Sequence, residues 1–250
     1  MIKVLLCGAC GKMGGNVLAL LENDPDATVV CGVDLYPKEI GVPVYQSFAN
    51  VSEEVDVIID FSSPVGLQER LEFAKNRNAG IVLASTGFTA EDLQLIQSYE
   101  PHVAIFRTAN LSLGINLMQA LVKAAAQVLG NSFDVEIIEK HHNLKKDAPS
   151  GTALMLADSV NEAFDGNKEY VYGRQGIVGA REQKEIGIHA VRGGTIVGDH
   201  DVIFAGEDEV ITISHSAASK RVFAVGAIRA AKWLKGKVAG RYEMKDILSE

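Results

Sequence analysis

The strongest constraint on the fold is a glycine-rich turn that directly follows the first apolar segment. Residues 2–7 read IKVLLC, a run typical of a strand covered on both faces, and residues 7–15 continue as CGACGKMGG. Gly8, Gly11 and Gly14 permit a tight turn, close approach of backbone amides to a pyrophosphate, and close helix packing. The start of the following helix favours the same anion. This arrangement predicts a dinucleotide site, with a purely structural turn as the alternative.

An acidic residue lies where such a site needs one. Asp34 follows Gly14 by twenty residues and ends the second apolar run, ATVVCGV. An acid at this place binds the adenosine ribose hydroxyls. Its charge disfavours a 2′-phosphate, although Lys12 and Lys38 could offset that effect, and no arginine follows the acid. The sequence thus leans toward NADH while leaving both NADH and NADPH open.

Strand and helix patterns alternate through the first half of the chain. Further short apolar runs occupy 55–60, 80–86 and 102–107. Helices are expected over 62–78, with Ser63 as N-cap and Pro64 at the first helical position, and from Thr89 onward. Repeated strand–helix–strand units predict an α/β fold with a Rossmann-type parallel sheet wound by helices on both sides.

The pattern changes near residue 109, which predicts a second domain. We expect a long helix over 112–129 closed by Gly130, a strand over 133–139 and a helix from about Ser150. A polar, glycine-rich loop should cover 165–184. Three strand-like runs follow at 185–191, 195–206 and 209–217, and a helix at 219–236. We therefore predict a dinucleotide-binding domain of 1–108 plus 217–250, and an α+β domain of 109–216 with a mixed sheet for substrate binding and oligomerisation.

Charge and composition exclude several classes of protein. The 250 residues carry a formal net charge of −8, which argues against a nucleic-acid partner. We expect no secretory signal and no apolar run of the length that a membrane span needs, hence no membrane partner and a cytoplasmic location. Cys7, Cys10 and Cys31 are too few for a disulfide framework. Cys7 and Cys10 spell C-x-x-C, but a redox or metal site lacks a second pair, and burial of Cys7 and Cys31 on neighbouring strands is the simpler interpretation.

The segment EKHHNLKKDAPSGTA at 139–153 gathers positive charge on an acidic chain. His141 and His142 are adjacent on an extended chain and point to opposite sides, which makes them poor chelators of one metal. The helix start at 149–152 offers free amides and hydroxyls to a carboxylate. A histidine can also donate a proton near neutral pH. The segment predicts a site for a small diacid; a solvated loop with surface lysines, such as Lys146, is the alternative.

Seven motifs occur in order along the chain: GACGKMG, DFSSP at 60–64, STGF at 85–88, ANLSLGINL at 109–117, the segment of 139–153, GIHAVRGGTIVGDHDV at 187–202 and ASKRVFAVGAIRAAKWL at 218–234. Together they resemble one enzyme family, the 4-hydroxy-tetrahydrodipicolinate reductases (dihydrodipicolinate reductases) of the diaminopimelate–lysine pathway. The resemblance covers nearly the whole chain, and the H-H-x-x-K…P-S-G-T run is its most specific part.

The resemblance implies an NADH- or NADPH-dependent reduction of 4-hydroxy-tetrahydrodipicolinate, a cyclic dicarboxylate, to tetrahydrodipicolinate by a homotetramer. It implies that His141 is the proton donor and Lys145 its cationic partner. Carboxylates of the substrate would be held by His142, Ser150, Gly151 and Thr152. The cofactor would be bound by Gly8, Gly11, Lys12, Met13, Gly14 and Asp34, and near the nicotinamide by Ser85, Thr86, Gly87, Ala109 and Asn110. No metal is expected.

Two departures from the family pattern affect the cofactor site. Family members often read G-T-T-G-F where this chain has Ala84 to Phe88, and a basic residue after Asp34 is missing. Two other functions stay open from the residues alone. A homoserine- or aspartate-type dehydrogenase would share the glycine loop without needing the 139–153 segment. A non-catalytic NAD(H)-sensing regulator would need a recognition module that the sequence does not offer.

Overall fold

The computed structural model describes residues 1–250, which divide into two compact units. The first unit contains Met1–Ser112 and Arg221–Glu250, and the second contains Leu113–Lys220. The chain therefore leaves the first unit once and returns to it through its last thirty residues.

The first unit alternates strands and helices, as the sequence predicts. Its elements are β1 (Ile2–Cys7), α1 (Lys12–Leu21), β2 (Ala27–Val33), β3 (Val44–Tyr45), a 3-10 turn (Phe48–Asn50), β4 (Val57–Asp60), α2 (Leu67–Asn76), β5 (Gly80–Leu83), α3 (Ala90–Tyr99), β6 (Ala104–Arg107), α6 (Arg221–Leu234), β12 (Gly240–Tyr242) and α7 (Met244–Leu248).

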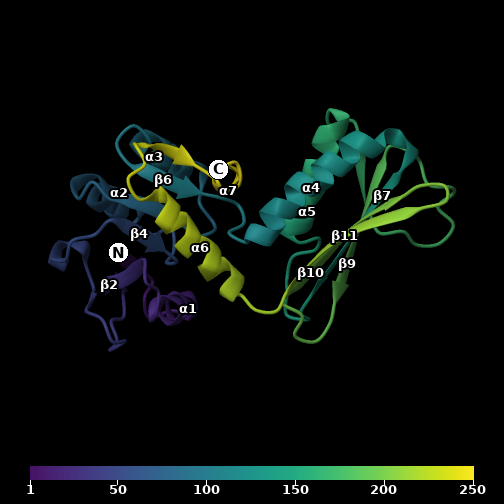
Figure 1. Cartoon of the computed structure of the whole chain (residues 1–250). Helices are drawn as coiled ribbons and strands as arrows, with labels where there is room; N and C mark the ends of the chain where they lie inside the picture. Colours follow the sequence, from purple (N-terminus) through teal and green to yellow (C-terminus); the bar gives the residue numbers. More distant parts are fainter. The chain divides into compact units, whose positions relative to one another are not determined.

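All seven strands of the first unit form one parallel sheet in the order β12-β6-β5-β4-β1-β2-β3 (Figure 1). The order reverses direction at β1, so the loops after β1 and β4 lie at the switch point where doubly wound sheets bind ligands. Helix α6 packs against β4, β5 and β6 and also against α1. The predicted Rossmann-type sheet is confirmed.

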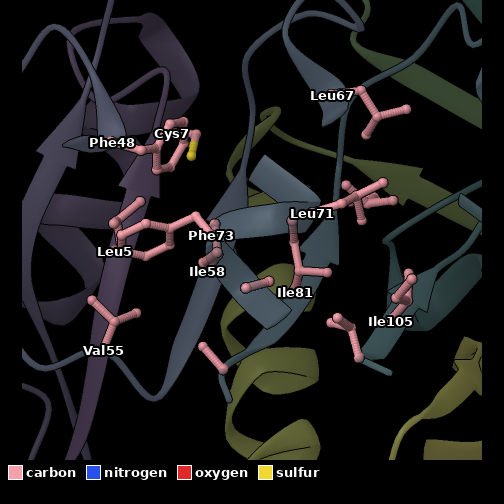
Figure 2. Close-up of a cluster of buried hydrophobic side chains, with 14 of the residues drawn as sticks. Leu5, Cys7, Phe48, Val55, Ile58, Leu67, Leu71, Phe73, Ile81 and Ile105 are labelled. Atoms are coloured by element: carbon pink, nitrogen blue, oxygen red, sulfur yellow. The ribbon is translucent and has the colours of Figure 1, made fainter. Parts of the chain in front are cut away.

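Helices α2 and α3 cover the opposite side of this sheet from α6. They enclose an apolar core between themselves and the strands. Figure 2 shows Leu5, Ile58 and Ile81 from neighbouring strands near Leu71 and Phe73 of α2. The side chains of Leu5, Ile58 and Ile81 are fully buried, as expected for parallel strands covered on both faces. This packing fixes the carboxyl edge of the sheet, from which the candidate cofactor residues extend.

The second unit combines two long helices with a mixed five-stranded sheet. Its elements are α4 (Leu113–Leu129), a 3-10 turn (Gly130–Ser132), β7 (Asp134–His141), α5 (Gly151–Asn161), a 3-10 turn (Glu162–Phe164), β8 (Glu169–Tyr172), β9 (Glu185–Arg192), β10 (Gly198–Ala205) and β11 (Val210–Ala217). The strand order is β11-β10-β7-β9-β8. Strand β10 is antiparallel to β7 and β11, whereas β7, β9 and β8 run parallel, so the predicted mixed sheet is confirmed.

Helices α4 and α5 lie side by side on one face of the second sheet (Figure 1). Residues Leu113–Ser132 form a helical segment that reaches a mean hydropathy of 1.2. By length and composition alone this segment could cross a membrane, contrary to the expectation that no apolar run has the length of a membrane span. Helices in the core of a protein without any membrane contact meet the same criterion. Here Ile115, Met118, Val122 and Ala126, at helical spacing, are buried against the sheet.

Several element boundaries differ from the sequence expectation. Helix α2 begins at Leu67 after Gly66, whose φ of 78° is left-handed, and Ser63 does not cap it. The buried Arg70 guanidinium donates to the carbonyls of Ser63 and Val65 (2.6 and 2.9 Å), which holds 63–66 in a turn. Thr89 caps α3 as predicted, through a capping box with Asp92.

The remaining differences concern strands that are short or have weak patterns. Strand β7 runs to His141 instead of ending at residue 139, so this histidine lies on the sheet and not in the following loop. The expected loop of 165–184 contains β8, which is held by backbone pairing to β9. Strands β3 and β12 and helix α7 were not predicted, because two to five residues give too little periodicity to recognise.

Candidate functional site

The glycine loop after β1 is built so that no larger residue fits at two of its positions. Gly8 has a φ of +73°, and a Cβ on it would lie 3.0 Å from the Phe61 carbonyl oxygen. A Cβ on Gly14 would lie 2.4 Å from the carbonyl oxygen of Ala9. The amide of Gly11 donates to the Gly8 carbonyl at 3.1 Å and closes the turn. The loop therefore packs directly against α1 and the end of β4.

Helix α1 presents an uncapped N-terminus at this loop. Gly11 is its N-cap and supplies no side-chain hydrogen bond, and the first turn contains no acidic residue. Lys12 at the first helical position is exposed, and Met13 is half-buried. Free amides, the helix dipole and one lysine together suit a phosphate group.

Asp34 is fixed at the rim of the same loop. Its Oδ2 accepts the Cys10 amide and its Oδ1 accepts the Tyr36 amide, both at 3.0 Å. The carboxylate thus ties the glycine loop to the turn after β2. A fixed acid beside a glycine loop is the geometry that binds ribose hydroxyls.

Asp34 lines a cavity of about 430 Å³ at the carboxyl edge of the first sheet. The other lining residues come from the loops after β1, β2 and β4 and from α2: Cys7, Gly8, Val33, Leu35, Tyr36, Gln46, Phe48, Ser62, Ser63, Val65, Gly66, Glu69 and Arg70. Leu35, Tyr36 and Val65 are exposed apolar or aromatic side chains that offer flat contacts to a base.

Arg70, which lines this cavity, belongs to a buried ion pair. Asp60, which is fully buried, lies 3.0 Å from Nε of Arg70, although that nitrogen is not aligned for a hydrogen bond. The Asp60 Oδ1 accepts both the amide and the hydroxyl of Ser62, and its Oδ2 accepts the Ser85 hydroxyl at 3.2 Å. One carboxylate therefore holds α2 and the loops after β4 and β5 together.

The residues that the family resemblance places near a nicotinamide lie on the loops after β5 and β6. Ser85 is held by Asp60, while Thr86 and Gly87 are exposed and Gly87 has a φ of +83°. Ala109 is exposed, and the Asn110 Oδ1 accepts the Ser112 amide at 2.9 Å. All of them extend from the same carboxyl edge as the glycine loop.

Two of the three cysteines lie in the core of the first unit. All three cysteines are free, and Cys7 and Cys31 are buried on the adjacent strands β1 and β2. Burial raises the pKa of Cys31 to about 12 and that of Cys7 well above its ordinary value, so both stay protonated. The simpler interpretation of these residues is confirmed.

In the second unit, a buried carboxylate organises the segment of 139–153. Glu139 has no solvent exposure, and four donors fill the acceptor positions of its two oxygens. Its Oε2 lies 2.6 Å from Nδ1 of His141 and 2.7 Å from Nη1 of Arg192. Its Oε1 accepts the Ser150 amide at 2.9 Å and Nη2 of Arg192 at 2.7 Å. Burial alone would raise the Glu139 pKa, but these hydrogen bonds lower it below its ordinary value.

Ser150 joins this cluster to helix α5. Its hydroxyl caps the helix by accepting the Ala153 amide at 3.1 Å, and it lies 3.2 Å from Nε2 of His200. The side chain is buried, and its hydroxyl holds the helix start in place. Gly151 at the first helical position is exposed and the first turn has no acidic residue, so the positive end of the helix faces solvent near half-buried Thr152.

The remaining members of the predicted substrate set lie in the turn after β7. The Lys145 amide donates to the His142 carbonyl at 3.1 Å, and Nζ of Lys145 pairs with Asp147 at 2.9 Å. That hydrogen bond lowers the pKa of Asp147. Nδ1 of His142 is buried without a partner, whereas Lys146 is exposed.

Sequence reasoning missed four residues that build these sites: Asp60, Glu139, Arg192 and His200. Glu139 could have been found, because it ends a predicted strand two residues before His141, and residues two apart on an extended chain share one face. Arg192 and His200 come from β9 and β10, and only the register of the sheet brings them to β7.

A doubly wound parallel sheet with this glycine loop, and a second unit that carries a histidine and lysine cluster, define an oxidoreductase that uses a pyridine nucleotide. The two units also match two family models. Residues 2–111 match the dihydrodipicolinate reductase N-terminus, and residues 114–248 match the dihydrodipicolinate reductase C-terminus.

Individual relatives agree with these models. A 4-hydroxy-tetrahydrodipicolinate reductase of Caldanaerobacter subterraneus is 50% identical over 250 residues, which cover 100% of this chain and 99% of the relative. One from Clostridium botulinum is 44% identical and covers 99% and 98% of the two chains. A dipicolinate-bound dihydrodipicolinate reductase from Paenisporosarcina superposes with a TM-score of 0.79 at 26% identity, covering 97% of both chains.

The chain belongs to the dihydrodipicolinate reductase family. The predicted family and the predicted oxidoreductase activity are confirmed. The homoserine- or aspartate-type dehydrogenase and the NAD(H)-sensing regulator are thereby set aside.

Proposed function

We propose that this chain reduces 4-hydroxy-tetrahydrodipicolinate to tetrahydrodipicolinate in the diaminopimelate route to lysine, with NADH as the preferred hydride donor. The residues of the first unit fit the cofactor. Gly14 leaves no room for a side chain, the α1 amides are uncapped, and the cavity beside Asp34 has room for a nucleoside. Gly8, Gly11, Lys12 and Met13 would hold the pyrophosphate, and a bound nicotinamide supplies the hydride.

The charges around the cavity support NADH over NADPH. Two carboxylates, Asp34 and Glu69, line it, and they would repel the 2′-phosphate of NADPH. The only cation among the lining residues, Arg70, is buried and already paired with Asp60. Lys38 is exposed and does not line the cavity. Among the lining residues, a phosphate would therefore meet two negative charges and no unpaired cation.

The second unit supports a diacid substrate. The observation that carries the proposal is the joint attachment of His141 and the Ser150 amide to Glu139, which fixes a histidine beside the positive end of α5. That helix end, with Gly151 and Thr152, would bind one carboxylate, and His142 and Lys145 add positive character. The Paenisporosarcina relative was solved with dipicolinate, a related ring diacid.

The chemistry assigns separate tasks to the two basic side chains. Loss of the 4-hydroxyl group as water leaves a C=C bond conjugated with the ring imine, and hydride addition to this conjugated system places negative charge on the nitrogen, which a proton must neutralise. His141 would deliver that proton from Nε2, because Nδ1 is occupied by Glu139 and no protein group bonds Nε2. Lys145 would stabilise the developing charge. Ser85, Thr86, Gly87, Ala109 and Asn110 would position the nicotinamide.

We further propose that the protein is a cytoplasmic homotetramer that assembles through the second sheet. Helices α4 and α5 cover only one face of that sheet. The row Ser214, Asp201, Ile138 and His189 crosses the other face, and none of these four residues is fully buried. This face is available to a second copy of the chain.

Steady-state kinetics with both cofactors tests the proposal. With enzymatically generated substrate, we expect kcat/KM to be higher with NADH than with NADPH. Asp34→Ala should weaken NADH binding more than NADPH binding, because the ribose acid is lost together with its repulsion of the phosphate. Equal losses for both cofactors would remove Asp34 from the ribose site. No oxidation of either cofactor by the wild-type protein would refute the reaction itself.

A further inference from the structure

Glu139 is a fully buried carboxylate of the second unit, and its contacts extend beyond a single ion pair. A fully buried carboxylate is rare unless its charge is compensated. Here two arginine nitrogens, one histidine nitrogen and one backbone amide lie within 2.6–2.9 Å of its oxygens. An acid that only neutralised Arg192 would not need the other two donors.

The contact to His141 fixes the state of the ring. An ionised carboxylate can only accept hydrogen bonds, so Nδ1 of His141 must carry the proton in this contact. Nε2 then carries a lone pair when the ring is neutral and a second proton when the ring is charged. A Cβ on Gly198 would lie 3.1 Å from that Nε2, so glycine at this position keeps the space beside it open.

Arg192 keeps Glu139 ionised and oriented. Its two terminal nitrogens form a bidentate pair with the two oxygens, and Nη2 also donates to the Asp147 carbonyl at 2.7 Å. This forked contact fixes the carboxylate in one orientation, in which Oε2 faces Nδ1 of His141. Arg192 thereby connects the end of β9 to the turn that carries Lys145.

We propose that Glu139, clamped by Arg192, is the positioning residue that holds His141 with Nδ1 protonated and Nε2 free, and so prepares it to donate a proton to the substrate. This inference rests on the proposed function, in which His141 is the proton donor. Through the Ser150 amide the same carboxylate also fixes the start of α5. The distance between proton donor and carboxylate-binding helix end is therefore set by one side chain.

The test compares Glu139→Gln with a matched variant on the same strand. Glu136 also contacts a histidine, His189, at 2.6 Å and two arginines, but it lies on the opposite face of β7. We expect Glu139→Gln to lower kcat roughly 10²- to 10⁴-fold, as when the acid that orients a catalytic histidine is removed. The KM for substrate and the Kd for NADH should change less than about threefold. Glu136→Gln should keep wild-type kcat, with its assembly state checked by light scattering.

A spectroscopic readout separates positioning from simple structural support. In ¹⁵N-labelled protein, the His141 ring should show a low-field Nδ1 proton resonance, and Glu139→Gln should abolish it. Because the single variant leaves the half-buried Arg192 without its charged partner, the double variant Glu139→Gln, Arg192→Gln serves as a second test. It should fold and show the same loss of kcat.

Three results would overturn the inference. One is a kcat within twofold of wild type in Glu139→Gln or in the double variant. Another is a loss confined to KM, which would assign Glu139 to substrate binding. The third is an unchanged Nδ1 resonance. If His141→Gln kept full turnover, the proton donor of the proposed function would itself be wrong; a normal loss there with wild-type turnover in Glu139→Gln would reject the positioning role alone.

Discussion

Two buried histidines of the second unit differ in what they can do with a proton. His141 contacts the carboxylate of Glu139, whereas the one hydrogen-bond partner of His200 is the Ser150 hydroxyl and its Nδ1 is buried without a partner. Burial lowers the pKa of His200 to about 4, and the charges of His141 and His215 act in the same direction against the weaker effects of Glu139 and Asp199. His200 is therefore neutral at physiological pH, which suits a structural role and not proton transfer.

This difference predicts a pH-dependent stability. The folded-state pKa of His200 lies below its unfolded value of 6.5, so the unfolded chain binds the extra proton between about pH 6.5 and 4. Stability is complete above pH 6.5 and is lost as the pH falls, by about 2 kcal/mol between pH 6.5 and 5. In His200→Gln this loss should shrink by that amount.

Urea unfolding followed by circular dichroism at pH 6.5 and pH 5 checks the prediction. The variant still contains His215, whose pKa burial also lowers, so some loss should remain in both proteins. An identical pH dependence in wild type and variant would show that His200 is not held neutral by burial.

At the scale of elements, the sequence predicted those strands, turns and helix ends whose local residue pattern favours the same structure as their tertiary contacts. Strand β1, the glycine loop and the Thr89 cap of α3 carry residue patterns that tertiary contacts only reinforce. Helix α2 starts later than predicted because the Arg70 side chain donates to the backbone carbonyls of Ser63 and Val65. In a longer helix, those carbonyls would accept backbone amides instead. That contact depends on the buried pair with Asp60, which no local pattern reveals.

The candidate sites divide in the same way. His141, Lys145 and the α5 start are close in sequence, so one motif brought them together. Arg192 and His200 reach Glu139 only through the pairing of β9 and β10 with β7, and that register was not predictable from the residues. Contacts between distant strands are thus the part that the structure adds.

Helix α1 allows a test of its packing with two neighbouring glycines. A Cβ on Gly14 would meet the Ala9 carbonyl at 2.4 Å, whereas a Cβ on Gly15 would meet nothing within 4 Å. Gly14→Ala should therefore lower the stability of the apo protein by several kcal/mol or displace the loop and weaken NADH binding. Gly15→Ala should raise stability by about 0.5–1 kcal/mol, since alanine favours a helix.

Thermal unfolding without cofactor, and NADH titration of each variant, measure both effects. Equal behaviour of the two variants would mean that Gly14 is not in close contact with the loop.

At the scale of the whole molecule, the proposed function assigns different parts of one reaction to the two units. The first contains the cavity beside Asp34, and the second contains the cluster around Glu139. The overall charge of −8 coexists with local positive ends of α1 and α5, whose first turns contain no acidic residue. Alternation of strands and helices predicted the fold class, because each strand–helix unit must bury its own apolar face.

The central claim is that His141 and Lys145 carry out the proton transfer and charge stabilisation of the reductase. The most direct measurement is the kcat of His141→Gln and Lys145→Met with enzymatically generated 4-hydroxy-tetrahydrodipicolinate and saturating NADH, together with the Kd of NADH by fluorescence titration. We predict a kcat lower by about 10²- to 10⁴-fold with a nearly unchanged Kd, because general acid assistance is lost while the first unit stays intact. Turnover at the wild-type rate in either variant would contradict the account.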